Sequence, residues 1–293
     1  AVLRGEGAQP QDAENGDDDM VRVAFSPDGT RVATTSTDGT AAVWSVPRGT
    51  RLAVCRGHTL SVFDAVFAPD GESLYTASAD RTLRRWDANT GAPSVVLAGH
   101  TDDILRVSLH ASAEGVRLLT ASEDRTARLW SDRAAALAIP LTAHTDAVVD
   151  AQFSPDGARV VTASHDGTAR LWDAATGALV TTLGGHTGAL NAAVFSPDGS
   201  LLVTASRDRT ALVRDARDGA ARFTLGGHTD SVSFAAFSRD SARIVTASRD
   251  RTARVWDARS GVLVATLQGH TERVFAAAFS PDASLVVTAS EDR

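Results

Sequence analysis

The chain has 293 residues, of which 43% are hydrophobic and 22% are charged, a composition that is ordinary for a globular protein and argues against disorder. The net charge of −7 gives no general attraction to phosphate backbones, and no stretch approaches the roughly 20 apolar residues of a membrane span, so we expect neither a nucleic-acid nor a membrane partner. The single cysteine, Cys55, excludes an internal disulfide framework and fits a reducing compartment, so we expect a cytoplasmic location.

A repeat of about 42 residues organises the chain. Gly-His dipeptides end at His58, His100, His186, His228 and His270, and an Ala-His dipeptide ends at His144. Gly16 stands 42 residues before His58 and is followed by a first copy that lacks the histidine. Repeats therefore begin near residues 17, 58, 100, 144, 186, 228 and 270, and such a period decides the architecture of a chain.

Each copy predicts four short strands separated by turns. In the fourth copy we expect strands at 147–153, 158–164, 168–172 and 178–183. In the first turn, SPDG, Pro155 pre-sets φ, Asp156 can bond nearby backbone, and Gly157 tolerates a positive φ. Because a lone four-stranded sheet exposes both faces, the sheets have to stack, and about seven of them arranged radially close a ring. The predicted fold class is all-β: a seven-bladed β-propeller of four-stranded antiparallel blades, with the last blade incomplete.

These repeats resemble the WD-repeat β-propeller family. Gly-His, Ser-x-Asp and Trp-Asp recur together from about Asp17 to Arg293, and all five tryptophans fall in one column of the repeat. The resemblance implies a single propeller domain over residues 1–293, in which residues 1–4 supply a closing strand to the seventh repeat. The Ala- and Arg-rich copies look like bacterial WD-repeat domains that accompany a signalling domain, so we expect a piece of a longer protein.

One stretch, VTASHDGTARLWD (161–173), carries the three residue types of a nucleophilic triad, Ser164, His165 and Asp166. Triad members usually meet through the fold and not by adjacency, and the other copies replace His165 by Thr, Ala, Glu or Arg. No Gly-x-Ser-x-Gly elbow occurs, and the histidines fall about one per repeat, unlike the ligands of a metal site. Paired carboxylates such as Asp102 and Asp103 are most simply solvated loop charge. We therefore expect no enzyme activity, no metal and no cofactor.

The resemblance implies a structural role for the recurring polar residues. In the family, the His, the Ser/Thr, the turn Asp and the Trp of one blade form a buried hydrogen-bonded network. The first and fifth blades should be looser, because Gly16 replaces the His and Arg214 replaces the Trp. Carried over, the complete sets are His58, Ser78, Asp80 and Trp86; His100, Ser122, Asp124 and Trp130; His144, Ser164, Asp166 and Trp172; and His228, Ser248, Asp250 and Trp256.

The resemblance also implies a binding face, where the histidine loops and the Ser-x-Asp turns surround the channel mouth. The fifth residue after each His reads Val21, Phe63, Leu105, Val149, Asn191, Ser233 and Phe275. Val21 and Val149 can equally well plug the channel, whereas an aromatic side chain is not required by the packing of the repeat. Aromatic anchors beside arginines are typical of binding hot spots. The candidate ligand-binding residues are Phe63, Phe275, Val21, Leu105, Arg207, Arg249 and Arg273, with Asp19, Asp103, Glu123 and Glu291 on the acidic side.

The sequence thus predicts a non-catalytic interaction or sensing scaffold that binds a protein or peptide. Two alternatives stay open. One is an enzyme with a single active site at the channel mouth, and the other is a purely structural or oligomerisation module.

Overall fold

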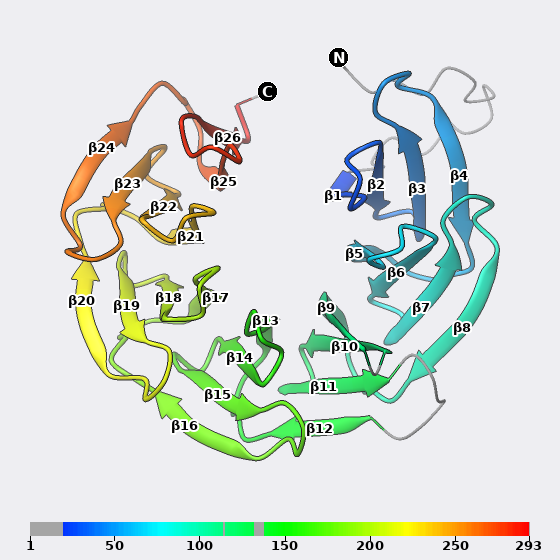
Figure 1. The fold of residues 1–293 in the computed structure, drawn as a ribbon, viewed down its shortest axis with the longest axis horizontal. Coiled ribbons are helices and arrows are strands. Elements are labelled where there is room, and N and C mark those ends of the chain that lie inside the picture. Colours follow the sequence, from blue (N-terminus) through cyan, green and yellow to red (C-terminus); the bar gives the residue numbers. More distant parts are fainter. Residues whose placement is uncertain (1–19, 114, 132–137, 293) are drawn as a thin grey trace. The chain divides into compact units, whose positions relative to one another are not determined.

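The computed structural model describes residues 20–113, 115–131 and 138–292, and all regular structure in these residues is β-strand (Figure 1). They fall into two compact units. The first contains the described residues up to Asp124 together with 128–131 and 138, and the second contains 125–127 and 139–292. No helix in the described part of the chain is long and apolar enough to cross a membrane.

Six four-stranded antiparallel sheets follow one another along the chain, each with its strands in sequence order. The first three consist of β1 (Met20–Phe25), β2 (Arg31–Ser36), β3 (Thr40–Ser45) and β4 (Arg51–Arg56); β5 (Val62–Phe67), β6 (Ser73–Ser78), β7 (Thr82–Asp87) and β8 (Pro93–Ala98); and β9 (Ile104–Ser112), β10 (Gly115–Ser122), β11 (Thr126–Ser131) and β12 (Ile139–Thr142).

The next three sheets consist of β13 (Val148–Phe153), β14 (Arg159–Ser164), β15 (Ala169–Asp173) and β16 (Leu179–Leu183); β17 (Leu190–Phe195), β18 (Leu201–Ser206), β19 (Ala211–Asp215) and β20 (Ala221–Leu225); and β21 (Val232–Phe237), β22 (Arg243–Ser248), β23 (Ala253–Asp257) and β24 (Leu263–Leu267). A seventh, two-stranded sheet consists of β25 (Val274–Phe279) and β26 (Val286–Ser290).

The predicted fold class is confirmed: the blades are four-stranded and antiparallel, and the last one is incomplete in the described residues. In the fourth repeat each strand lies within one residue of its predicted bounds. The turn also forms as expected, since Gly157 has a φ of 67° and its amide donates to the Ser154 carbonyl at 2.8 Å. The single domain over residues 1–293 stays a prediction, and the expected closing strand at residues 1–4 lies outside the described residues.

Hydrophobic clusters form between consecutive sheets within each unit. In the second unit, one cluster joins Val203 and Val213 of the fifth sheet to Ile244 and Trp256 of the sixth. In the first unit, another joins Val43 of the first sheet to Leu74 and Trp86 of the second. The sheets therefore bury their faces by stacking, which is how a repeat that cannot bury its own faces becomes stable.

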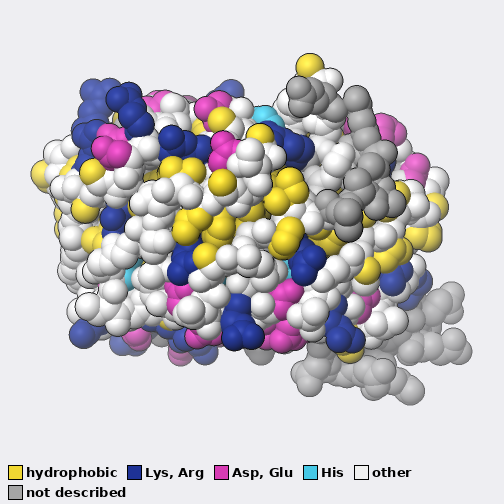
Figure 2. All heavy atoms as spheres, turned by 90° about the horizontal axis from the view of Figure 1, so that it is seen from below, with side chains coloured by type: hydrophobic (Ala, Val, Ile, Leu, Met, Phe, Trp, Pro, Cys, Tyr) yellow, Lys and Arg dark blue, Asp and Glu magenta, His cyan; other side chains and the backbone are white. Residues whose placement is uncertain are grey.

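The outer strands carry apolar side chains into solvent. Figure 2 views the molecule from the side of β12 and β16 and shows a band of hydrophobic side chains between charged ones. Ile139 is 37% exposed, Leu179 45% and Val180 47%. These residues lie on the edge strands, which the sheets do not cover.

Every first strand of a sheet contains one β-bulge. The pairing register with the second strand skips one residue, so that Val62 pairs with Ser78 and Asp64 with Ala77, while Phe63 has no partner. The same shift occurs in β1, β9, β13, β17, β21 and β25. The skipped residues are Val21, Phe63, Leu105, Val149, Asn191, Ser233 and Phe275, which form the column that the sequence assigned to the binding face.

Candidate functional site

A chain of hydrogen bonds ties the histidine loop of the fourth sheet to the sheet itself. The His144 Nδ1 atom lies 2.8 Å from a carboxylate oxygen of Asp166, in the turn after β14. On the other side of the ring, Nε2 lies 2.8 Å from the Thr162 Oγ1 atom. The Trp172 indole Nε1 donates to the same threonine oxygen at 2.9 Å. Thr162 is fully buried, so this chain closes without water.

The same contacts recur in most of the other sheets. His–Asp distances are 2.7–2.8 Å and His–Thr distances 2.7–2.9 Å throughout. The sets are His58, Thr76, Asp80 and Trp86; His100, Thr120, Asp124 and Trp130; His144, Thr162, Asp166 and Trp172; His186, Thr204 and Asp208; His228, Thr246, Asp250 and Trp256; and His270, Thr288 and Asp292.

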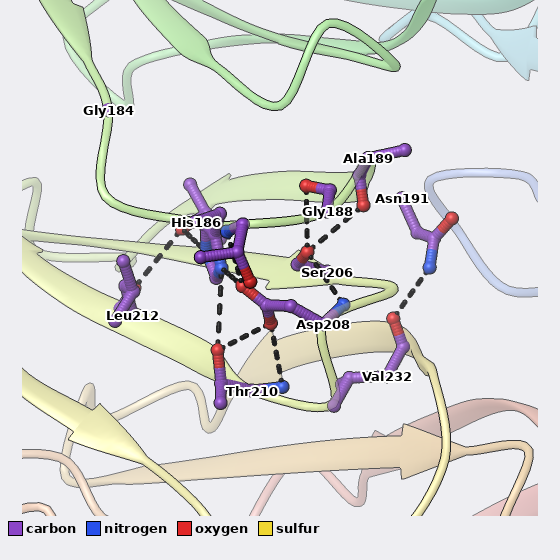
Figure 3. Close-up of polar contacts among 12 residues, drawn as sticks. Gly184, His186, Gly188, Ala189, Asn191, Ser206, Asp208, Thr210, Leu212 and Val232 are labelled. Carbon is purple, nitrogen blue, oxygen red and sulfur yellow. Dashed lines mark hydrogen bonds and ion pairs between the residues drawn. The ribbon is translucent and has the colours of Figure 1, made fainter.

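The serines assigned to these networks are in the wrong place to bridge them. Ser164 Oγ donates to the Asp146 carbonyl at 3.0 Å and accepts from the Asp166 amide at 3.0 Å. Figure 3 shows the equivalent Ser206 directed at the carbonyls of Gly188 and Ala189. Ser78, Ser122 and Ser248 likewise bond the histidine loop through its backbone. The threonine two residues earlier is the bridge, because it lies further inside the strand, within hydrogen-bond distance of the imidazole Nε2 atom, whereas the serine ends the strand beside the backbone of the loop.

The sequence contained a signal for this threonine. Thr34, Thr76, Thr120, Thr162, Thr204, Thr246 and Thr288 occupy one column, two residues before the conspicuous serine. In the first sheet, which has no histidine in this position, the Trp44 indole still donates to Thr34 at 2.9 Å.

The hydrogen-bond geometry assigns a neutral imidazole to each buried set that contains a tryptophan. The threonine hydroxyl accepts from the indole and so has its own proton left to donate, and the histidine Nε2 atom accepts it. The Nδ1–H group then donates to the aspartate. Burial lowers the pKa of His144 below its ordinary value, although the bond to Asp166 opposes this. Burial alone would raise the pKa of Asp166, but donors from Thr168, His144 and two backbone amides outweigh it and lower the pKa to about 2.

Two positions along β19 of the fifth sheet carry side chains that differ from those of the fourth sheet. The second, third, fourth and sixth sheets place an arginine two residues before the tryptophan, as in Arg170 and Trp172, and Arg170 lies 3.9 Å from Asp166. Here Leu212 holds the arginine position and Arg214 the tryptophan position. Arg214 is only 6% exposed and donates to the Gly184 carbonyl, and to the Gly219 carbonyl at 3.2 Å. Burial lowers the pKa of Arg214, which records the cost of holding a cation there. That the first and fifth blades are looser stays a prediction.

The structure separates the residues that a hydrolase would need to bring together. Ser164 bonds backbone, as described above, and His165 contacts the neighbouring sheet instead: the Arg207 Nη2 atom lies 2.9 Å from His165 Nε2. Burial and Arg207 both lower the pKa of His165, while Asp146 opposes them. Cys55 is buried and its pKa is raised to about 12, chiefly by that burial, so its thiol is not an activated nucleophile. No group of three potential metal-ligating side chains occurs among the described residues.

In the first unit, the candidate ligand residues Phe63 and Leu105 are half-buried, and both occupy bulge positions. Val21 also lies at a bulge in β1, but its side chain is outside the described part of the structure. Near Leu105, burial and the neighbouring Asp102 raise the pKa of Asp103. Burial, Asp103 and Asp102 likewise raise the pKa of Glu123. Arg81 opposes the shift of Asp103 but does not outweigh the other two causes.

In the second unit, Phe275 is 41% exposed and the Arg273 guanidinium lies 5.6 Å from its ring centroid. Arg273 also bonds Glu291 at 2.5 Å, so Glu291 belongs with this arginine and not with the acidic residues of the first unit. Arg249 and Arg273 line a notch of about 310 Å³ together with Arg251. Arg207 is separate from this notch and bonds His165 and Asn191.

The neutral histidines make stability depend on pH. His58, His100, His144, His186 and His228 all have pKa values lowered by burial, so below about pH 6.5 the unfolded chain binds protons that the folded chain does not. We expect the urea midpoint to fall as the pH is lowered from 7 to 5. A further fall is expected below pH 3.8, because the pKa values of Asp166 and Asp250 are lowered to about 2. A midpoint that rises between pH 7 and pH 5 would contradict the neutral assignment.

Comparison with known families gives a match along most of the chain. The family model described as "WD domain, G-beta repeat" matches residues 14–45, 49–87, 91–131, 137–173, 177–215, 219–257 and 261–293. A search of curated proteins gave no match. Domains built from this repeat generally mediate protein–protein interactions and are typically not catalytic.

Proposed function

Because the chain belongs to the WD-repeat family, whose domains generally mediate protein–protein interactions, we propose that it binds a peptide or protein segment at the sheet ends that carry the histidine loops. The bulges are the observation that carries this proposal. A bulge re-aims a side chain out of the regular pleat and often lies beside a functional site. Here every described first strand contains one bulge residue, at the same end of the sheet as the histidine loop.

Phe63 and Phe275 are the proposed aromatic anchors. Both are re-aimed by a bulge, and neither belongs to a buried hydrophobic cluster of the described residues. An aromatic side chain brings a large contact area at low entropic cost, which is why such residues dominate binding hot spots. Leu105 and Val21 are proposed to extend the apolar contact.

Charge supports a polarity for the ligand. In the second unit, Arg249 and Arg251 are exposed beside Phe275 and lie in the notch, so an acidic group next to the apolar anchor is favoured. Arg207 and Arg273 are proposed as weaker contributors, because each already has a partner. In the first unit, burial and Asp102 raise the pKa of Asp103, and burial, Asp103 and Asp102 raise the pKa of Glu123, so a basic group would relieve the repulsion between these carboxylates.

The proposal has no catalytic step, since the threonine hydroxyl that each histidine of the buried sets contacts is itself buried, as at Thr162, where no substrate reaches it. On the resemblance of its Ala- and Arg-rich repeats, we further propose that the chain is the interaction module of a larger cytoplasmic, bacterial signalling protein. A purely structural or oligomerisation role is the competing candidate, and light scattering on the purified chain tests it.

The double variant Phe63→Ala/Phe275→Ala tests the proposed face. Peptides are first selected on the wild-type chain from a displayed random library, and their affinities are then measured by calorimetry. We expect the double variant to lose about 2 kcal/mol or more of binding free energy, as truncation of an aromatic hot spot does.

Phe25→Ala is the matched control, because Phe25 is 65% exposed on β1 and is not a bulge residue. Its affinity should equal that of the wild type. Undiminished binding by a correctly folded Phe63→Ala/Phe275→Ala variant would place the site elsewhere.

A further inference from the structure

A groove of about 750 Å³ opens among turns of the fourth, fifth and sixth sheets, all in the second unit. Its lining comes from the turns between β13 and β14, β17 and β18, β19 and β20, and β23 and β24. Because successive strands are antiparallel, these turns lie at the sheet ends opposite to the histidine loops. The volume is within the range of roughly 300–1,000 Å³ that is usual for ligand sites.

The groove has an apolar floor. Phe195 and Leu201 line it from the fifth sheet, and Ala216 and Ala258 line it from the turns after β19 and β23. All four are buried, with exposed fractions of 9% or less, so they form a surface rather than protruding side chains.

The carboxylates of the groove are already occupied by their own turns. Asp156 accepts from Ser154 Oγ at 2.5 Å and from the Ala158 amide at 3.0 Å. Asp198 accepts from Ser196 Oγ and from both the amide and the hydroxyl of Ser200.

Asp215 accepts from the Arg217 amide at 2.9 Å and from the Arg222 guanidinium at 2.5 Å. That guanidinium is the first cause of the low pKa of Asp215, so this carboxylate stays ionised and engaged. The acidic side of the groove therefore has its partners within the protein.

The arginines of the groove differ in whether they have partners. Arg159 donates to the carbonyls of Arg217 at 2.7 Å and Ala216 at 3.2 Å, and so joins the fourth sheet to the fifth. The guanidinium groups of Arg217 and Arg259, by contrast, are exposed and make no hydrogen bond or ion pair within the described residues.

These two arginines are not a requirement of the repeat. The turns of the second and fourth sheets carry Asn89 and Ala175 in the same column. The polar groups of the groove that lack a partner within the described residues are thus the N–H donors of Arg217 and Arg259. A planar guanidinium pairs with a carboxylate through two parallel hydrogen bonds.

We propose that this groove is a second binding site, which takes an acidic peptide segment. Carboxylates of the segment pair with Arg217 and Arg259, and its apolar side chains cover the floor at Phe195 and Leu201. The site is independent of the proposed Phe63 and Phe275 face, because none of its residues lies at a histidine-loop end.

The test is fluorescence anisotropy with a dye-labelled decapeptide of alternating glutamate and leucine, and with its lysine–leucine counterpart. The full chain should bind the glutamate peptide and not the lysine peptide, and added salt should weaken the binding. Arg217→Ala/Arg259→Ala should weaken it at least tenfold, and Arg217→Gln/Arg259→Gln should do the same without removing the side-chain stems. Circular dichroism checks that both variants are folded.

Two further variants locate the binding. Arg51→Ala/Arg56→Ala removes two exposed arginines of β4 in the first unit and should leave the affinity unchanged. Phe63→Ala/Phe275→Ala should also leave it unchanged, which separates this site from the other. Equal affinity for the two peptides, or full affinity in the Arg217 and Arg259 variants, would overturn the proposal. Loss of binding only in the phenylalanine variant would move the acidic peptide to the histidine-loop ends.

Discussion

Replacing Thr162 by Val is expected to lower the free energy of unfolding by about 2–5 kcal/mol, because it leaves two buried groups without partners at about 1–3 kcal/mol each. The His144 Nε2 atom loses its donor and the Trp172 indole loses its acceptor. Valine has nearly the same shape as threonine, so the change removes the hydroxyl without opening a cavity. Urea unfolding of the two proteins measures the difference.

Two neighbouring substitutions serve as controls. Ser164→Ala removes bonds to backbone only and should cost about 1 kcal/mol, the usual net value of a single hydrogen bond. Thr145→Val changes an exposed threonine beside His144 and should be nearly neutral. A Ser164→Ala effect that equals or exceeds that of Thr162→Val would restore serine as the bridge.

The double substitution Leu212→Arg/Arg214→Trp is expected to raise the free energy of unfolding by about 1–3 kcal/mol, the range for satisfying a buried group that now lacks its partner. It gives the fifth sheet the arrangement of the others, with an indole that donates to Thr204 and a guanidinium near Asp208. It also relieves the burial that lowers the pKa of Arg214. Urea unfolding again gives the measurement.

The two single variants make this a double-mutant cycle. Leu212→Arg alone brings a second cation beside Arg214, and Arg214→Trp alone crowds the indole against Leu212, so each should destabilise. Side chains in contact typically show coupling energies of about 0.5–3 kcal/mol. Single effects that simply add up to the double effect would show that the exchange along β19 is not compensatory.

Much of the fold could be predicted because its determinants are local. The turn residues Pro155, Asp156 and Gly157 act within four residues of one another, and similar turn residues recur in the other copies of the repeat. The bulges could not be predicted in this way. An extra residue in a strand is visible only in the pairing register with its neighbour, so the column of Phe63 could be assigned to the binding face but not recognised as a bulge.

The candidate site could also be predicted only in part. His144, Asp166 and Trp172 meet as the resemblance implied, but the serine does not bridge them, because Thr162 and Ser164 are both buried and differ only in their position along β14. The partner of Arg273 and the exchange of Arg214 with Leu212 depend on three-dimensional proximity. The groove at Arg217 and Arg259 is built from turns that lie about 40 residues apart, so no local pattern marks it.

The protonation state of the buried histidines tests most directly the central claim that each repeated polar set is a closed chain of hydrogen bonds that ties the histidine loop to its sheet. Long-range ¹H–¹⁵N spectra of the uniformly labelled chain, recorded from pH 8 to pH 5, report which ring nitrogen carries the proton. For His58, His100, His144 and His228 we expect a neutral ring with a protonated Nδ1 and a bare Nε2, and a midpoint of titration below pH 6.5. A proton on Nε2, or titration at or above pH 6.5, would contradict the claim, since Nε2 would then not accept from the threonine, or burial would not be holding the ring neutral.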